Sequence, residues 1–196
     1  MGKIRFSASL SLDGYMAGPD QSEEDPLGIR GMELHTWLFD LEAWRKTHGE
    51  PGGRVDASTQ VVEELERGFG AVVMGRNMFG PIRGEWGEAA LWRGWWGDNP
   101  PYHTPVFVLT HHERETLEME GGTTFHFVTD GAEAAMGRAS AAAGDAGVID
   151  EFWLSIVPLL LGSGVRPLDG LSTLPALEVI DVVAAPDVTH IKYSIR

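Results

Sequence analysis

Residues 71–74 form an apolar run, and a glycine, an arginine and an asparagine follow it at positions 75–77. This pattern is suited to binding an anion. Residues 71–74 predict a buried strand, and Gly75 allows a tight turn and the close approach of a ligand. A helix that begins at Arg76 or Asn77 would direct free N–H groups toward that ligand. The planar charge of Arg76 suits phosphate. The same residues also fit a strand that ends in a surface turn with a solvated arginine.

Two further turns place polar residues directly after predicted strands. Residues 105–110 and 124–128 predict strands, which end at the turns Thr110-His111-His112 and Thr129-Asp130-Gly131. In a largely parallel sheet the carboxyl ends of the strands lie at one edge, where ligands bind. We therefore expect the three turns to lie at the same edge. We expect no metal site at the adjacent histidines, because neighbouring residues at a strand end point to opposite faces.

The other strand patterns define the expected sheet. Residues 4–15 alternate with period two and predict a strand that turns at Asp13-Gly14. Residues 152–161 predict a long apolar strand, and residues 176–195 predict an antiparallel hairpin. With helices between the earlier strands, this order predicts an α/β fold of three layers. Its central sheet is mainly parallel and ends in a C-terminal antiparallel hairpin.

Three segments show helical patterns. Residues 32–46 and 61–69 carry apolar side chains at helical spacing. Residues 130–133 resemble a capping box, with Asp130 in the capping position, and they would open an alanine-rich helix that ends near Gly144. Between these elements, residues 80–102 hold four tryptophans among glycines and prolines. This aromatic segment could contact a ligand, but we favour a packing role for it.

Composition excludes several functional classes. The 196 residues include 29 acidic and 15 basic side chains, for a formal net charge of −14, which disfavours nucleic-acid binding. An anionic cofactor would then need a local positive site such as Arg76. The sequence has no cysteine, no apolar run long enough to span a membrane and no visible signal peptide. We therefore expect a cytoplasmic protein without a membrane partner.

Four motifs in this order resemble the dihydrofolate-reductase-like superfamily, and within it the C-terminal reductase domain of the bifunctional riboflavin-biosynthesis deaminase/reductase. They are Ser11-Leu12-Asp13-Gly14-Tyr15-Met16-Ala17, Val73-Met74-Gly75-Arg76-Asn77-Met78-Phe79, Val106-Phe107-Val108-Leu109-Thr110 and Pro158-Leu159-Leu160-Leu161-Gly162-Ser163-Gly164. The resemblance implies one domain over residues 1–196 and an NADPH cofactor. It also implies a small heterocyclic or sugar-derived substrate and a homodimer, for which residues 152–161 and the aromatic segment could supply the interface.

The resemblance also implies roles for individual residues. Gly75, Arg76 and Asn77 would hold the NADPH phosphates, and Thr110 and His111 would lie near the adenosine 2′-phosphate, with Thr129 as a further cofactor residue. Asp13 would face the nicotinamide or the substrate as the catalytic residue, or it would serve only as a turn residue. Ser155 would point into the substrate pocket, or it would be a satisfied core hydroxyl. Trp37 is assigned to substrate binding as well.

One departure from the family pattern lies near residues 144–148. Family members carry a strand, a glycine run and a helix before the segment that corresponds to Ile149, whereas here Gly144 passes almost directly into that segment. A strand of ~5 residues and a helix of ~10 are therefore missing. Either the protein lacks this unit, or the sequence omits a segment that the protein contains. We favour the second, because loss of a central strand would leave its neighbours unpaired.

The resemblance therefore implies an NADPH-dependent reductase that transfers a hydride to a C=N or C=O bond. An alternative from another class is a non-catalytic protein with the same fold, which would use residues 84–96 to bind a ligand or partner.

Overall fold

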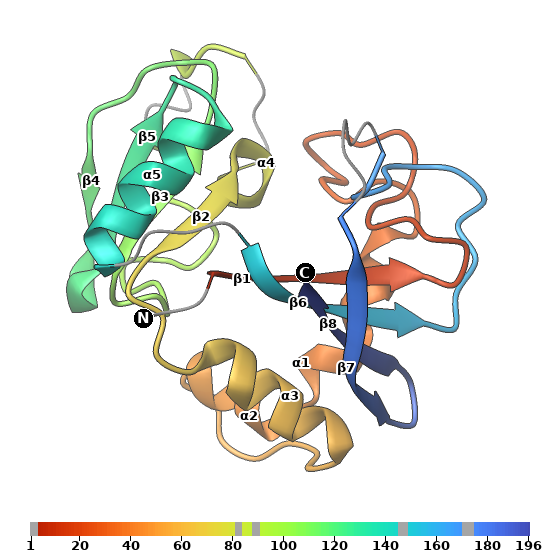
Figure 1. The fold of residues 1–196 in the computed structure, drawn as a ribbon. Coiled ribbons are helices and arrows are strands. Elements are labelled where there is room, and N and C mark those ends of the chain that lie inside the picture. Colours follow the sequence, from red (N-terminus) through yellow and green to blue (C-terminus); the bar gives the residue numbers. More distant parts are fainter. Residues whose placement is uncertain (1–3, 81–83, 88–90, 145–148, 170–174) are drawn as a thin grey trace. The chain divides into compact units, whose positions relative to one another are not determined.

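The computed structural model describes residues 4–80, 84–87, 91–144, 149–169 and 175–196. The chain divides into two compact units (Figure 1). Unit 1 comprises residues 1–2 and 68–147, and unit 2 comprises residues 3–67 and 148–196. Within the described residues, no helix has the length and apolar character needed to cross a membrane.

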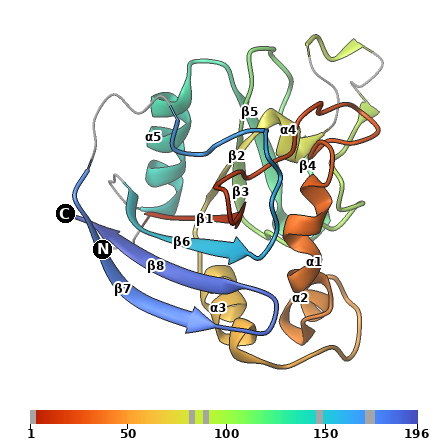
Figure 2. The same ribbon diagram turned by 90° about the vertical axis from the view of Figure 1, so that its right-hand side faces the viewer.

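Unit 2 contains a four-stranded sheet in the order β1-β6-β8-β7 (Figure 2). Its strands are β1 (Ile4–Ser11), β6 (Ile149–Val157), β7 (Leu177–Ala184) and β8 (Thr189–Ile195). The β1/β6 pair is parallel, whereas β6/β8 and β7/β8 are antiparallel. The predicted C-terminal hairpin is therefore confirmed. The predicted strand over residues 152–161 was wrong at its end, because Pro158 has no N–H group with which to extend the ladder.

The period-two pattern separates the two faces of this sheet. On one face, Leu10, Phe152 and Leu154 form an apolar cluster. The opposite face meets the helices, where Arg5 and Lys192 both bond to Glu64 of α3 (Ala57–Glu66). Strand alternation thus directs one set of side chains toward the helices and the other away from them.

The single helix predicted over residues 32–46 was wrong. The segment forms η1 (Gly31–His35), α1 (Thr36–Phe39) and α2 (Glu42–Thr47). Leu41 is extended, with ψ of 136°. The Arg54 N–H donates to the Asp40 carbonyl at 2.6 Å, and the Glu42 N–H donates to the Arg54 carbonyl at 3.0 Å. The backbone on either side of Leu41 therefore pairs with a distant residue instead of continuing the helix.

Unit 1 contains a second four-stranded sheet in the order β2-β3-β5-β4. Its elements are β2 (Val72–Gly75), α4 (Arg76–Phe79), β3 (Pro105–Leu109), β4 (Leu117–Glu118), η3 (Glu120–Gly122), β5 (Thr124–Val128) and α5 (Ala132–Ala143). The β2/β3 and β3/β5 pairs are parallel, and the β4/β5 pair is antiparallel. The predicted strands at 71–74, 105–110 and 124–128 are confirmed to within one residue at each end.

Side chains of β3 point alternately to the two faces of the unit 1 sheet, and each face has its own apolar core. Phe107 and Leu109 pack with Ala135 and Ala139 of α5, which covers one face of the sheet (Figure 1). Val106 and Val108 face an aromatic cluster on the other side. That cluster contains the buried Trp86, and the partly buried Trp92 and Trp96 pack against it, whereas Trp95 is exposed. The predicted packing role of the aromatic segment is confirmed for the first three.

The capping role predicted for Asp130 was wrong. Gly131 occupies the capping position of α5, and no side chain caps that end. Asp130 instead accepts a hydrogen bond from Arg138 at 2.6 Å. The helix ends as predicted, with Gly144 in the left-handed conformation that glycine favours. The described capping box lies on α3, where the Ser58 N–H donates to Asp56 and the Asp56 N–H donates to Thr59.

In each sheet, one of the two edge strands runs parallel to its neighbour. These are β1 in unit 2 and β2 in unit 1. The junction predicted to lack a strand and a helix includes residues 145–148, which lie outside the described residues.

Candidate functional site

The three predicted turns lie at one edge of the unit 1 sheet. Gly75 is in register with Leu109, and Leu109 is in register with Val128. Because β2, β3 and β5 are parallel neighbours, the turns that follow them leave the sheet at the same level. Arg76, Thr110 and Thr129 are the residues that directly follow β2, β3 and β5. The expected grouping of the turns is therefore confirmed.

Arg76 is bonded to the second of these turns. Its Nη1–H donates to Thr110 Oγ1 at 3.3 Å, and the same oxygen accepts the His112 backbone N–H at 3.2 Å. The Arg76 Cζ atom lies 3.1 Å from the centroid of the Trp86 ring. Burial lowers the pKa of Arg76, and the nearby charge of Arg114 lowers it further. The guanidinium still remains protonated at neutral pH.

Two hydrogen-bond donors of Arg76 lack a partner. Its Nε and Nη2 atoms are buried and have no hydrogen-bond partner in the structure. The backbone at Gly75 borders open space, since a Cβ added there would meet no atom within 4 Å apart from its chain neighbours. Asn77 and His111 are exposed at the same edge. The helix predicted to begin at Arg76 or Asn77 does begin at Arg76, but α4 is a single turn of four residues. Its dipole is therefore small, and the charge of Arg76 dominates.

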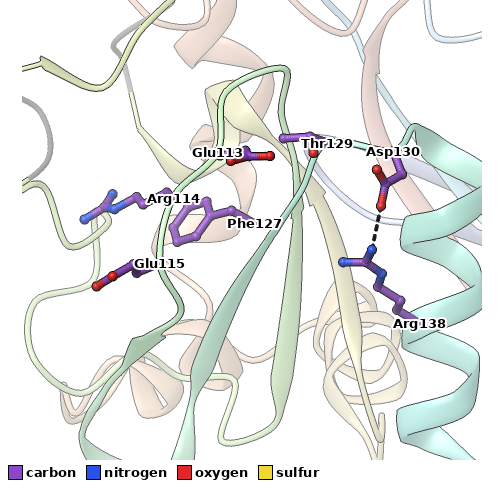
Figure 3. Close-up of a pocket in the computed structure, with 7 residues that line it drawn as sticks. All are labelled: Glu113, Arg114, Glu115, Phe127, Thr129, Asp130 and Arg138. Carbon is purple, nitrogen blue, oxygen red and sulfur yellow. Dashed lines mark hydrogen bonds and ion pairs between the residues drawn. The ribbon is translucent and has the colours of Figure 1, made fainter.

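A groove of about 550 Å³ lies beside the carboxyl end of β5 (Figure 3). Its lining residues are mostly charged, namely Glu113, Arg114, Glu115, Phe127, Thr129, Asp130 and Arg138. Figure 3 shows Asp130 and Arg138 turned toward each other, with Arg114 and Glu115 on the far side of the Phe127 ring. Thr129, predicted to contact the cofactor, thus lines a groove. Sequence reasoning missed Arg114 and Arg138, which belong to no recognisable motif.

The described residues contain no group of three histidine, aspartate or glutamate side chains placed to hold a metal ion. His111 is exposed, and His112 Nδ1 lies 3.0 Å from Glu85 Oε1.

Asp13 lies in the turn after β1 in unit 2 and binds the loop after β6. Its carboxylate accepts the Leu161 N–H at 3.1 Å and the Gly162 N–H at 2.7 Å. A hydrogen bond from the Ser11 side chain and these backbone bonds lower the pKa of Asp13 to about 2. Asp13 is therefore ionised at neutral pH, and it can accept hydrogen bonds but cannot serve as a proton donor.

Ser155 belongs to a buried chain of hydrogen bonds. Its Oγ lies 2.8 Å from His190 Nδ1, and Ser58 Oγ lies 2.9 Å from His190 Nε2. His190 is 0 % exposed, and burial lowers its pKa to about 4. The neutral ring has one donor and one acceptor nitrogen, so both hydroxyls can be satisfied. Sequence reasoning missed His190, because this chain joins residues from three distant parts of the sequence.

Trp37 packs edge-on against His190, with ring centroids 4.9 Å apart. Its Nε1–H donates to the Leu34 carbonyl at 3.0 Å. Trp37 also lines a groove of about 400 Å³, together with Glu33, Thr36, Asp40, Arg54, Val157, Pro158, Leu159, Pro186 and Asp187. In this groove, Arg54 pairs with Asp187 at 2.6 Å.

Comparison with known proteins identifies the class of the fold. A protein from Shewanella sp. PV-4 assigned to riboflavin biosynthesis matches with a TM-score of 0.58 and 21 % identity, covering 100 % of this chain and 99 % of that chain. A diaminohydroxyphosphoribosylaminopyrimidine deaminase/5-amino-6-(5-phosphoribosylamino)uracil reductase from Thermotoga maritima matches with a TM-score of 0.51 and 12 % identity, covering 99 % and 56 % of the two chains. The fold is the predicted dihydrofolate-reductase-like α/β fold.

Residues 2–143 match the family model of the RibD C-terminal domain, so the chain belongs to that family. No curated protein matches the sequence. Membership of the family supports a reductase-type role.

Proposed function

We propose that the protein is an NADPH-dependent reductase that acts on a small heterocyclic or sugar-derived substrate. One observation supports this most strongly. The Arg76 guanidinium has two buried donors without a partner, and it lies at an edge where three parallel strands end. A half-buried cation with free donors is well suited to a phosphate.

The residues of unit 1 fit the phosphates of such a cofactor. In this proposal, Arg76 and Asn77 bind phosphate oxygens, and the open space at Gly75 lets the ligand approach the backbone. Thr110, His111 and Thr129 lie on the neighbouring turns, and in this proposal they bind the adenosine 2′-phosphate. NADPH, when bound, supplies a hydride to a C=N or C=O bond. The protein's contribution is to bind and orient the cofactor.

The residues of unit 2 are assigned to the substrate. Asp13 is held as a carboxylate by the Leu161 and Gly162 N–H groups, so its proposed role is to accept a hydrogen bond from the substrate and orient it. The proton that accompanies reduction has to come from another group or from water. Trp37 would form part of the wall of the substrate site, which is the groove of about 400 Å³. Ser155 would act through the hydrogen bond that it shares with His190.

A second candidate function is a cofactor-binding protein without reductase activity. In this candidate the carboxylate of Asp13 only holds the loop after β6, through the Leu161 and Gly162 N–H groups, and takes part in no reaction. Two measurements separate the candidates. Quenching of tryptophan fluorescence during titration with NADPH tests cofactor binding, and consumption of NADPH with pyrimidine and pteridine substrates tests reduction. Binding without consumption would favour the second candidate, and no binding would contradict both.

We also propose a cytoplasmic homodimer in which residues 1–196 of each copy form one domain. In the two segments first considered for the interface, Phe152, Trp153 and Trp86 are only 6 %, 1 % and 7 % exposed, and the exposed apolar residues Trp95 and Leu160 are 46 % and 61 % exposed. Strand β7 exposes Leu177, Val179 and Val182, which are 45 %, 55 % and 57 % exposed. These residues would supply the interface. Light scattering of wild type and of the Val179→Asp variant tests this proposal: a wild-type monomer would contradict it.

A further inference from the structure

Among the residues that the structure describes, no acidic side chain balances the charge of Arg76. In the part of the chain that the structure describes, no carboxylate forms an ion pair with Arg76. Burial lowers the pKa of Arg76, and the charge of another cation, Arg114, lowers it further. The Arg114 Cζ atom lies 4.6 Å from the centroid of the Trp86 ring, over which Arg76 also lies. An anion beside Arg76 would favour its charged form and oppose this lowering of its pKa.

Trp86 is held firmly in the position where it meets Arg76. Its Nε1–H donates to the His112 carbonyl at 3.1 Å. Its ring meets the Phe79 and Phe127 rings edge-on, with centroids 6.0 Å and 5.1 Å apart. With 7 % of its surface exposed, the indole has little freedom to change rotamer. Trp86 can therefore fix the plane of a group that lies on it.

We propose that Trp86 is a positioning residue for Arg76 in cofactor binding, which rests on the proposed function. The Arg76 Cζ atom lies over the Trp86 ring, and the N–H donors of a guanidinium all lie in its own plane, so contact with the ring limits the directions in which these donors can point. Thr110 fixes one end of that plane through Nη1. The two remaining donors, Nε–H and Nη2–H, then point in a fixed direction, in which they can bind two oxygens of a phosphate. Trp86 does not touch the cofactor in this proposal, and it acts through Arg76 alone.

The competing explanation is that Trp86 serves only to fill the aromatic core of unit 1. A double-mutant cycle separates the two roles. The affinity for NADPH is measured by calorimetry on the full chain for wild type, Trp86→Leu, Arg76→Ala and the double variant. Trp96→Leu is the matched control, since Trp96 packs against the same cluster through Phe125 and Tyr102.

We expect Trp86→Leu to weaken NADPH binding about 2- to 30-fold, the range for a cation–π contact. In the Arg76→Ala background the same change should have no further effect, because there is no guanidinium left to position. The control should keep wild-type affinity. An equal loss in both backgrounds, or no loss at all, would overturn the inference. A wild-type chain that binds no NADPH would overturn the proposed function, and this inference with it.

Arg76→Lys gives a second test that does not remove a core side chain. Lysine retains the charge but has no planar fork to lie on the ring. If Trp86 positions Arg76, this variant should lose nearly as much affinity as Arg76→Ala, and Trp86→Leu should cost it little more. Retention of wild-type affinity by Arg76→Lys would show that charge alone is sufficient, and it would overturn the inference even if Trp86→Leu failed to fold.

Discussion

Ser155 Oγ and His190 Nδ1 lie 2.8 Å apart inside unit 2, and Ser58 bonds the other ring nitrogen of the same histidine. This buried chain accommodates a neutral ring only, since a protonated His190 would place a charge where no water reaches it. Burial accordingly lowers the pKa of His190 to about 4, while the charge of Asp56 partly opposes that shift.

The first prediction concerns stability at acidic pH. The folded-state pKa of His190, about 4, lies below the ordinary value of 6.5, so between these values the unfolded chain binds more protons. The free energy of unfolding should therefore rise with pH through this interval, by about 3 kcal/mol in full. Urea unfolding at several pH values would measure the slope. His190→Gln should flatten it, and His48→Gln, at an exposed position, should not.

The second prediction concerns cofactor choice. Arg76→Ala should weaken NADPH binding by ~1.5–3 kcal/mol, the range for hydrogen bonds to a charged group. The wild-type protein should bind NADPH more tightly than NADH. Arg45→Ala is the control, because Arg45 pairs with Glu50 in unit 2. Equal affinity for the two cofactors would contradict a 2′-phosphate site at Thr110 and His111.

The third prediction concerns the open space at Gly75. The backbone there has φ of −78°, which any residue can adopt, and a Cβ would meet no protein atom within 4 Å. Gly75→Ala should therefore leave the melting temperature unchanged while it weakens NADPH binding, because the methyl group occupies space that the ligand needs. Unchanged affinity would show that the ligand does not approach this part of the backbone.

The fourth prediction concerns Asp13. Asp13→Asn keeps the shape of the side chain but removes the charge that the Leu161 and Gly162 N–H groups stabilise. We expect reductase activity to fall. Since the pKa of Asp13 is about 2, its ionisation should produce no inflection in the wild-type pH–rate profile between pH ~5 and 8. An inflection in this range that Asp13→Asn abolishes would contradict the assignment.

The fifth prediction concerns the junction at residues 144–148. If the sequence omits a strand and a helix, the intact mass of the purified natural protein should clearly exceed 21.4 kDa. NADPH should then protect this stretch from proteolysis, since a bound ligand stabilises the segment that contacts it. A mass of 21.4 kDa would mean that the protein truly lacks the unit, and it would favour the function without catalysis.

Local patterns in the sequence were sufficient to predict most of the sheet. Alternation in residues 4–11 and 105–109, and the turn glycines that follow strands, identify each strand without knowledge of its neighbours, because side-chain period and turn chemistry are local properties. For the same reason Gly75, Arg76, Thr110 and Thr129 could be named as a group before the structure was known. Parallel order alone places their turns at one edge.

Only the tertiary structure decided which distant residues meet. The pairing of Arg54 with the backbone around Leu41 divides a helix that the sequence pattern presents as continuous. The contact of Arg76 with Trp86 joins two elements across an irregular segment, and the burial of His190 between two serines joins residues far apart in the chain. Such contacts depend on how complete elements pack, and no short stretch of sequence carries that information.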